Sequence, residues 1–295
     1  MEFVAGIDGG GTKTIVVCSD LDGKILREER FGAFNVNSIG REGLTALMEE
    51  ITTFLRGMGR CASLCIGAAG CSSPSMQEVV AEAMKRADIG NWKLVGDHEI
   101  ALWGALEGKP GICLGVGTGT FCFGRNERGE SVRVGGWGHL IGDEGSGYAL
   151  GRDALRAVTR QWDGYGETTT LTEAAAKELG IDTGQKMVAY VYGKDKSAVA
   201  AFSRAVEREA AAGDTVAKAV LRENAKLLIG QAAVAAKRLG MKNGELALIG
   251  GLAESDTVYR ECLLREAAEC MPGFTCVSPR QTAAVGAVMM GRAQL

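Results

Sequence analysis

The 295-residue chain has few histidines, few prolines and no long apolar segment. It contains two histidines, His98 and His139, and four prolines. Neither histidine has a recognisable nucleophile as a partner, so the sequence does not indicate a hydrolase built on serine, histidine and aspartate. No uncharged apolar run approaches the ~20 residues that a membrane-spanning helix needs. We therefore expect no membrane partner.

The chain also has no excess of basic charge. Its formal net charge is -3 and its pI is about 5.7, so we expect no nucleic-acid partner. The first residues contain no basic region, and Glu2 and Asp8 interrupt the apolar run, so we expect no signal peptide. The nine cysteines are scattered, and several lie in apolar runs. We interpret them as reduced thiols of a cytoplasmic protein.

Glycine, in contrast, is abundant and clustered. The chain has 43 glycines, and the densest stretch is Gly135–Leu150, GGWGHLIGDEGSGYAL. Glycine lets the backbone turn sharply and approach a ligand closely. Aromatic, imidazole and carboxylate groups in such a frame are of the types that bind sugars, metal ions or phosphate. The stretch predicts a ligand site, and the alternative is a glycine-rich connector.

Two strand–turn–strand units predict phosphate-binding hairpins. The first joins Phe3–Ile7 to Ile15–Cys18 through a turn that includes Gly10, Gly11, Thr12 and Lys13. The second joins Ile112–Val116 to Phe121–Phe123 through Gly117, Thr118 and Gly119. Backbone amides and a hydroxyl are the donors that a phosphate needs, although each unit alone also fits an ordinary hairpin. Asp8, at the end of the first strand, is a candidate Mg²⁺ ligand, directly or through water.

The rest of the first third alternates between strands and helices. We expect strands at Ile25–Phe31, Leu64–Ala68 and Trp92–Gly96, and helices at Arg41–Arg56 and Glu99–Leu106. A third helix is expected to begin at a capping box formed by Ser75 and Glu78 and to end at Arg86. Three meander strands followed by this alternation predict an α/β fold with a mixed sheet and helices on both faces. Asp97, after the last strand, is a candidate catalytic base, the N-cap of the next helix, or both.

The second hairpin begins the pattern again, which indicates an internal duplication with domains at 1–109 and 110–281. A helical insertion without assigned chemistry is expected at Asp153–Gln161, Thr172–Leu179, Ser197–Ala211 and Asp214–Leu239. A strand at Leu246–Ile249 leads into Gly250 and Gly251, where the backbone can approach a phosphate or a flat ligand. Helices at Tyr259–Met271 and Thr282–Arg292 complete the chain.

Four segments carry a resemblance to a known family: Gly6–Thr14, Gly115–Gly119, Gly135–His139 and Gly142–Ser146. Together they resemble the sugar kinase branch of the actin-like ATPases, and most of all the BadF/BadG group that contains N-acetylglucosamine kinases. The resemblance implies two RNase H-like domains with mixed five-stranded sheets flanked by helices. It also implies that helix 282–293 returns to the N-terminal domain, that ATP and Mg²⁺ are used, and that the protein forms a homodimer.

The resemblance further assigns roles to residues. Asp97 falls where the family keeps its catalytic base, and the two turns and Gly250–Gly251 fall where it binds ATP. The amino sugar would be bound by Asn35, Gly136, Trp137, Gly138 and Asp143. From the residues alone, Trp137 either stacks on the sugar or wedges two strands, and His139 either contacts the sugar or holds its own loop. Thr120–Phe121 departs from the Ser-Asn pair of the acetylglucosamine kinases, which affects the expected fit of the sugar's substituents.

The implied activity is ATP-dependent phosphorylation of N-acetylglucosamine or glucosamine at O6. One alternative is an ATPase activator of a CoA dehydratase or reductase, which would hold an iron–sulfur cluster through Cys61, Cys65 and Cys71, although their spacing matches no cluster pattern. Another alternative is a non-catalytic sugar sensor on the same fold. The retained Asp8, Asp97 and Asp143 favour a catalyst.

Overall fold

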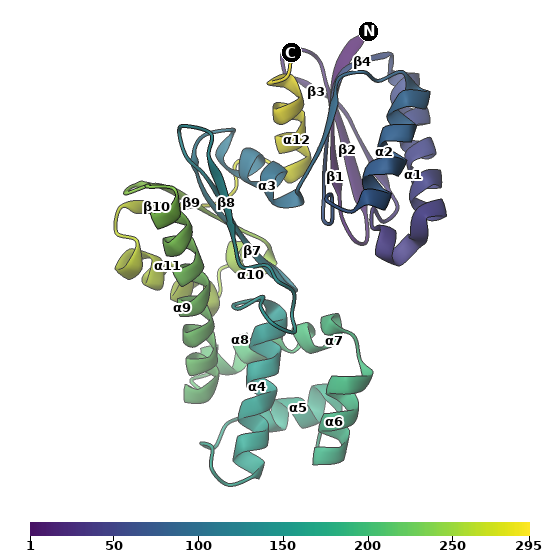
Figure 1. The fold of residues 1–295 in the computed structure, drawn as a ribbon. Helices are drawn as coiled ribbons and strands as arrows, with labels where there is room; N and C mark the ends of the chain where they lie inside the picture. The colour runs from purple at the N-terminus through teal and green to yellow at the C-terminus, as the bar shows by residue number, and fades with distance from the viewer. The chain divides into compact units, whose positions relative to one another are not determined.

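The computed structural model describes residues 1–295, apart from the side chain of Asn37. Its internal contacts divide the chain into two compact units (Figure 1). Unit 1 comprises Met1–Lys109 and Pro279–Leu295, and unit 2 comprises Pro110–Ser278. Each unit contains one five-stranded mixed sheet.

Unit 1 has the order of elements that its sequence predicts. The strands are β1 (Glu2–Gly9), β2 (Thr14–Ser19), β3 (Ile25–Phe31), β4 (Arg60–Ala68) and β5 (Trp92–Val95), and the helices are α1 (Val36–Met58), α2 (Pro74–Ala87), α3 (Asp97–Leu106) and α12 (Ala283–Arg292). The sheet order is β3-β2-β1-β4-β5. Strand β1 pairs antiparallel with β2 and parallel with β4, so its carboxyl end lies beside that of β4.

The alternation of side chains along β1 explains why helices cover both faces of this sheet. Phe3, Ala5 and Ile7 are buried in the cluster that packs against α1 and α2. Val4 points to the opposite face and packs with Ala284 and Val288 of α12. Successive side chains of a strand point to opposite faces, so an uninterrupted apolar strand needs cover on both. Figure 1 shows α1 and α2 on one side of the sheet and α3 with α12 on the other.

Helix α12 approaches its neighbours at two glycines. A Cβ on Gly6 of β1 would lie 2.3 Å from the backbone nitrogen of Val288. A Cβ on Gly286 of α12 would lie 2.1 Å from the carbonyl oxygen of Ile100 in α3. Both neighbours are backbone atoms, which cannot move aside as a flexible side chain can. These two positions therefore require glycine for close packing.

Unit 2 repeats the sheet and adds helices between its strands. The strands are β6 (Gly111–Val116), β7 (Thr120–Arg125), β8 (Ser131–Val134), β9 (Gly244–Ile249) and β10 (Phe274–Val277). The helices are α4 (Gly147–Trp162), α5 (Leu171–Leu179), α6 (Gly184–Gly193), α7 (Lys196–Ala201), α8 (Ser203–Ala211), α9 (Thr215–Arg238), α10 (Gly251–Glu254) and α11 (Val258–Cys270). The sheet order is β10-β9-β6-β7-β8. One apolar cluster joins the sheet to α4, α8, α9 and α11.

Several local predictions need correction. Helix α6 and strand β10 were not expected, and the predicted helix Ser197–Ala211 is two helices that meet at Phe202. The predicted capping box of Ser75 and Glu78 is wrong, because α2 starts at Pro74 with Ser73 as N-cap and no side-chain cap bond. Proline fits the first helical position because its missing N–H would be unpaired there anyway. Helix α1 begins at Val36, before the predicted Arg41, and contains a kink at Gly40 (φ 70°).

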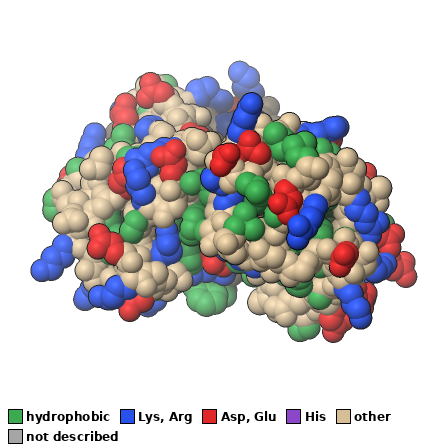
Figure 2. All heavy atoms as spheres, turned by 90° about the horizontal axis from the view of Figure 1, so that it is seen from above, with side chains coloured by type: hydrophobic (Ala, Val, Ile, Leu, Met, Phe, Trp, Pro, Cys, Tyr) green, Lys and Arg blue, Asp and Glu red, His purple; other side chains and the backbone are tan. Residues whose placement is uncertain are grey.

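The surface carries both signs of charge. In the view of Figure 2, Lys and Arg side chains are interspersed with Asp and Glu. Such a mixture gives no extended field of one sign on that face. In the part of the chain that the structure describes, no helix combines the length and the apolar character that a bilayer crossing needs.

Substitution of Gly286 tests the close packing of α12. We expect Gly286→Ala to destabilise unit 1 by about 1–3 kcal/mol, because the added methyl group meets the Ile100 carbonyl and overpacks the contact. Gly57→Ala is the matched control, because nothing lies within 4 Å of a Cβ at that helical glycine. Thermal unfolding should show a lower midpoint for Gly286→Ala only. Equal midpoints for both variants would show that the contact can relax.

Candidate functional site

Two of the predicted site carboxylates lie close together at the carboxyl end of the unit 1 sheet. Asp8 stands near the end of β1, and Asp97 follows β5 and begins α3. Strand β4 lies between β1 and β5, and it places Gly67 in register with both Asp8 and Val95. A Cβ on Gly67 would meet the Ile100 side chain at 2.3 Å, so glycine at that position lets α3 pack closely against the sheet. Asp8 and Asp97 are close enough for the charge of Asp97 to raise the pKa of Asp8.

Asp8 lies in an environment that disfavours its negative charge. Burial raises the pKa of its carboxyl group, the nearby Asp97 raises it further, and Lys13 opposes both effects. A carboxylate that is desolvated and faces a second carboxylate is a good place for a cation, which would relieve both penalties. This electrostatic arrangement fits the predicted Mg²⁺ ligand.

Asp97 is oriented by the first turn of α3 and still reaches solvent. Its Oδ1 accepts the His98 backbone N–H at 3.0 Å and lies 3.3 Å from His98 Nδ1. The N-cap of α3 is Gly96, whose N–H donates to Glu99 Oε1, so the alternative reading of Asp97 as the N-cap is wrong. The Asp97 side chain is 43% exposed. It is therefore accessible to solvent.

The first glycine turn lies beside Asn35. The Gly10 N–H donates to the Lys13 carbonyl at 3.0 Å and closes the turn, so this amide is not available to a phosphate. Among the described residues, the amides of Gly11 and Thr12 have no backbone partner. The Asn35 side-chain nitrogen would lie 3.9 Å from a Cβ on Gly11. The polar atoms of the turn and the Asn35 side chain thus lie close together at this end of unit 1.

The second glycine turn is held by the start of α4. The Gly117 N–H closes the turn on the Gly119 carbonyl at 3.0 Å. The N–H groups of Gly147 and Tyr148 donate to the carbonyls of Gly117 and Thr118 at 2.8 and 3.3 Å. These bonds orient the turn carbonyls toward α4. Within the described chain, the Thr118 amide has no backbone partner, and Thr118 lines a pocket.

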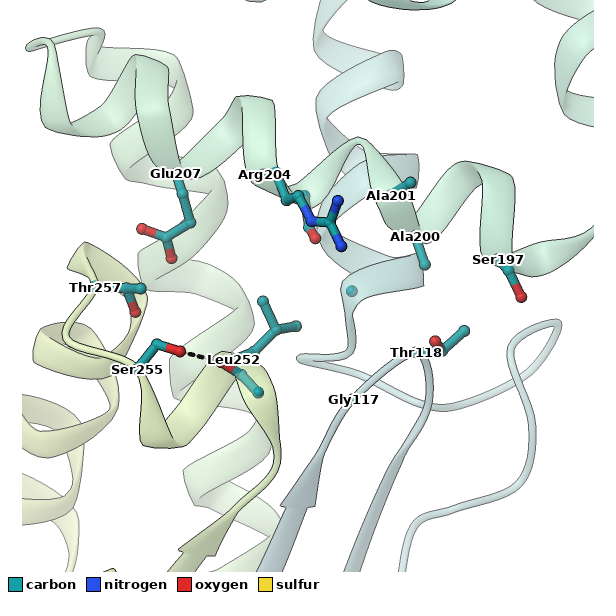
Figure 3. A pocket seen from close by; sticks show the side chains of 13 residues that line it. Gly117, Thr118, Ser197, Ala200, Ala201, Arg204, Glu207, Leu252, Ser255 and Thr257 are labelled. Atoms are coloured by element: carbon teal, nitrogen blue, oxygen red, sulfur yellow. Dashed lines mark hydrogen bonds between the residues drawn. The ribbon is translucent and has the colours of Figure 1, made fainter. Parts of the chain in front are cut away.

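A pocket of about 510 Å³ opens beside this turn within unit 2 (Figure 3). Its size is in the range of small-molecule sites. Thr118 forms one side, the α7–α8 segment with Ala200, Ala201 and Arg204 forms another, and Gly251–Leu252 form the third. Gly250, with φ 103°, lies just outside, and its Cα is so close to β6 that a Cβ would meet the Val116 carbonyl oxygen at 2.5 Å.

The sequence did not predict most of the pocket wall. Ser197, Ser203, Arg204 and Glu207 belong to helices that we expected to carry no chemistry, and Ser255 and Thr257 follow α10. Glu207 accepts the Tyr259 N–H at 3.0 Å, and burial raises its pKa. No short motif marks these residues, because the pocket joins segments that are far apart in the chain.

The predicted acceptor loop, Gly135–Asp143, is exposed at its tip and anchored at its end. Trp137 is 72% exposed, so it does not wedge two strands. His139 packs edge-on against Tyr148, with ring centroids 4.7 Å apart, which favours the reading in which it holds the loop. Asp143 is 6% exposed, and its Oδ1 accepts the Gly138 N–H at 3.2 Å. A Cβ on Gly119 would meet Asp143 Oδ2 at 2.7 Å.

Asp143 therefore connects the acceptor loop to the phosphate turn. Its backbone has φ 56°, a conformation that non-glycine residues rarely adopt and that asparagine and aspartate tolerate best. The Thr120 hydroxyl adds a second connection by donating to the Glu144 carbonyl at 3.1 Å. The Phe121 ring covers Gly115, where a Cβ would lie 2.1 Å from it.

The cysteines do not fit a metal cluster. Burial raises the pKa of Cys61 to about 11 and that of Cys65 to about 12, so neither is readily a thiolate. Burial raises the pKa of Cys71, and the negative charges of Glu99 and Asp97 raise it further. Among the described residues, no three His, Cys, Asp or Glu side chains form a group that could bind a metal ion.

The donor set does fit a magnesium–nucleotide complex. Mg²⁺ usually keeps several waters and takes one or two protein carboxylates together with phosphate oxygens. Within unit 1, Asp8 supplies one such carboxylate, and Gly11 and Thr12 of the first turn supply amides. Within unit 2, Thr118 of the second turn supplies an amide and a hydroxyl. The pocket beside Thr118 has room for a nucleoside.

Comparison with known proteins shows the same family along nearly the whole chain. The family model described as the BadF/BadG/BcrA/BcrD ATPase family matches residues 5–291. The N-acetylmuramic acid/N-acetylglucosamine kinase of Clostridium acetobutylicum is 33% identical in an alignment of 306 positions that covers 100% of this chain and 99% of that protein. The N-acetyl-D-glucosamine kinase of Dictyostelium discoideum is 27% identical in an alignment of 310 positions that covers 98% of this chain and 97% of that protein.

A solved structure shows that the fold is shared as well. A candidate N-acetylglucosamine kinase from Chromobacterium violaceum superposes with a TM-score of 0.76 at 26% identity, covering 98% of both chains. The resemblance and the α/β fold class expected from the sequence are confirmed by these comparisons.

The raised pKa of Asp8 predicts a pH-dependent effect of Asp8→Asn. The folded protein binds this proton more tightly than the unfolded chain does, so charged Asp8 lowers stability above its unfolded pKa of about 3.9. We expect Asp8→Asn to raise the unfolding midpoint at pH 7 in the presence of a chelator. The difference from wild type should shrink as the pH falls toward 4.

Thermal scans at pH 7 and pH 4 measure this difference. The control is Asp22→Asn in the exposed turn after β2, which should change neither midpoint by much. A lower midpoint for Asp8→Asn at pH 7 would show that the Asp8 charge stabilises unit 1 and would contradict the assigned electrostatics.

Proposed function

The chain belongs to the BadF/BadG/BcrA/BcrD ATPase family, and from this premise we propose that it is a kinase that phosphorylates an amino sugar. The donor is ATP with Mg²⁺, and the acceptor is N-acetylglucosamine or glucosamine, at O6. The names of the two curated relatives support the acceptor class. The observation in this structure that supports it best is the exposed Asp97 carboxylate beside the half-buried Asp8.

Asp97 is assigned the role of general base. Its carboxylate accepts the proton of the acceptor hydroxyl as the oxygen forms its bond to phosphorus. Phosphoryl transfer depends mainly on positioning and charge stabilisation. A general base typically contributes a further factor of about 10²–10⁴ to the rate. The His98 backbone N–H donates to Oδ1 of this carboxylate and orients it.

Asp8 and the two glycine turns are assigned to the donor. Asp8 would hold Mg²⁺, which supplies charge neutralisation to the phosphates. In the first turn Gly11, Thr12 and Lys13 would bind phosphate, with Gly10 closing the turn. In the second turn Thr118 would bind phosphate, with Gly117 and Gly119 shaping the backbone. Gly250 and Gly251 would border the nucleoside in the pocket of unit 2.

The acceptor is assigned to Asn35 and to the loop with Gly136, Trp137 and Gly138. The exposed Trp137 ring offers an apolar face to a sugar. Asp143 was predicted to bind the sugar directly, but its burial and its bond to Gly138 support a positioning role behind the loop. A homodimer remains a prediction. A cytoplasmic location is part of the proposal, because the nine cysteines are free thiols.

The two alternative functions receive less support. An ATPase activator with an iron–sulfur cluster needs accessible thiolates, whereas Cys65 is fully buried. A sugar sensor without catalysis has no need of an exposed carboxylate beside a second, desolvated one. Neither alternative has a feature of its own in this structure.

ADP release with Mg-ATP and a panel of hexoses and hexosamines tests the proposal. We expect turnover that depends on an amino sugar. Asp97→Asn should lower kcat by about 10²–10⁴-fold, because the amide cannot accept the hydroxyl proton. Its KM for ATP should change little, since Asp97 is assigned to the acceptor.

Asp88→Asn is a matched control, because Asp88 is an aspartate of unit 1 that caps the end of α2. It should retain wild-type turnover. ATP hydrolysis that ignores every sugar and survives Asp97→Asn would contradict the kinase assignment.

A further inference from the structure

Gln231 of α9 contacts both ends of the acceptor loop, Gly135–Asp143. Its Nε2 donates to Oε2 of Glu144, the residue that follows the loop, at 2.9 Å. Its Oε1 lies so close to Gly135 that a Cβ there would meet this oxygen at 2.2 Å. A single carboxamide on a long helix therefore touches the start and the end of the loop that is assigned to the acceptor.

The start of the loop has a conformation that suits this contact. Gly135 has φ 70°, in the left-handed region that favours glycine. A side chain at this position would be strained and would also displace the carboxamide of Gln231. The contact therefore needs glycine at the first position of the loop.

The end of the loop is held through Glu144. Its carbonyl oxygen accepts the Thr120 hydroxyl at 3.1 Å, and its half-buried side chain accepts the Gln231 amide. Glu144 directly follows Asp143, whose Oδ1 accepts the Gly138 N–H at 3.2 Å. The bond from Gln231 thus fixes the neighbour of the residue that shapes the middle of the loop.

Gln231 occupies this position at a cost. Its Oε1 is buried and has no hydrogen-bond partner among the described residues. A buried acceptor without a partner lowers stability, and most buried polar atoms avoid this state. An apolar side chain of similar size would pack at the same place without that penalty. The polar side chain is therefore better explained by its bond to Glu144 than by packing.

We propose that Gln231 is a positioning residue that orders the acceptor loop for sugar binding by holding its two ends. The inference rests on the proposed kinase function and adds a residue that does not itself touch the substrate. Without the bond, the loop would lose more conformational freedom when the sugar binds, and binding would become weaker. The bond does not involve the phosphate turns or Asp97, so the chemical step should be nearly unchanged once the sugar is bound.

Gln231→Glu tests the bond with a side chain of the same size. At pH 8 its carboxylate would face that of Glu144, and the two negative charges would repel each other. We expect the KM for N-acetylglucosamine to rise by about tenfold, which corresponds to the loss of a hydrogen bond to a charged group. The kcat and the KM for ATP should stay near their wild-type values.

The pH dependence of this variant is a readout that simple destabilisation would not give. As the pH falls toward 5.5, the two carboxylates can share one proton and form a hydrogen bond again. The ratio of the variant's KM to the wild-type KM, measured at each pH, should therefore fall toward one. Gln231→Met, which cannot form the bond at any pH, should keep a raised ratio throughout.

A double variant tests the pair directly. Gln231→Glu combined with Glu144→Gln exchanges the two groups and restores one bond between a carboxamide and a carboxylate. Its KM at pH 8 should be lower than that of Gln231→Glu alone. Gln185→Glu, at an exposed position of α6, is the control and should keep the wild-type KM.

The outcomes distinguish this inference from the proposed function. A wild-type KM in Gln231→Glu at pH 8, or a raised KM that neither low pH nor the double variant restores, would overturn the role of Gln231 and leave the kinase assignment intact. A loss of kcat with an unchanged KM would overturn it too. If Gln231→Glu does not fold, the KM of Gln231→Met decides in the same way. A wild type that phosphorylates no amino sugar would overturn the proposed function itself.

Discussion

The hydrogen bonds between the second glycine turn and residues 143–148 are the constraint on which the candidate site of unit 2 depends. Gly147 and Tyr148 hold the turn carbonyls, and Thr120 holds the Glu144 carbonyl. On the other side, the Tyr259 hydroxyl donates to the Gly145 carbonyl at 2.7 Å, and the Gly145 N–H donates to Asn224 Oδ1 at 3.1 Å. The two bonds of Gly145 are buried, where a lost partner is costly. They explain why one short stretch combines so many glycines with polar residues. Its backbone forms hydrogen bonds to the glycine turn on one side and to Tyr259 and Asn224 on the other, while the loop before it is exposed to solvent.

Unit 1 uses a different constraint, which is the close approach of backbones. Gly6 and Gly286 let α12 rest on β1 and α3 without side chains between them. The sheet is then covered on both faces, and the carboxyl ends of β1 and β5 remain free to present Asp8 and Asp97. Fixing these acids on a packed scaffold places two negative charges together at a cost in stability, as the raised pKa of Asp8 indicates. Such local strain is typical of sites that bind a cation or move a proton.

Much of this arrangement could be predicted from the sequence, because its signals are local. Largely apolar runs ending in glycine or aspartate predicted β1, β5, β6 and β9, and the glycine turns predicted both hairpins. The pocket wall at Arg204 and Glu207 could not be predicted, since their helices look like ordinary amphipathic scaffold. The inward direction of Asp143 was also hidden, because sequence gives the residue and not the bond to Gly138. Strand β10 was missed because its four residues carry too short a pattern.

The central claim is that the exposed carboxylate of Asp97 serves transfer of the γ-phosphoryl group of ATP to a sugar hydroxyl. The most direct measurement is ³¹P–¹H correlation NMR on the reaction of the purified chain with Mg-ATP and N-acetylglucosamine. The account predicts a new phosphomonoester whose phosphorus couples to the two protons on C6, formed in proportion to ADP. Inorganic phosphate as the only new phosphorus species would contradict it, because the terminal phosphate would then pass to water.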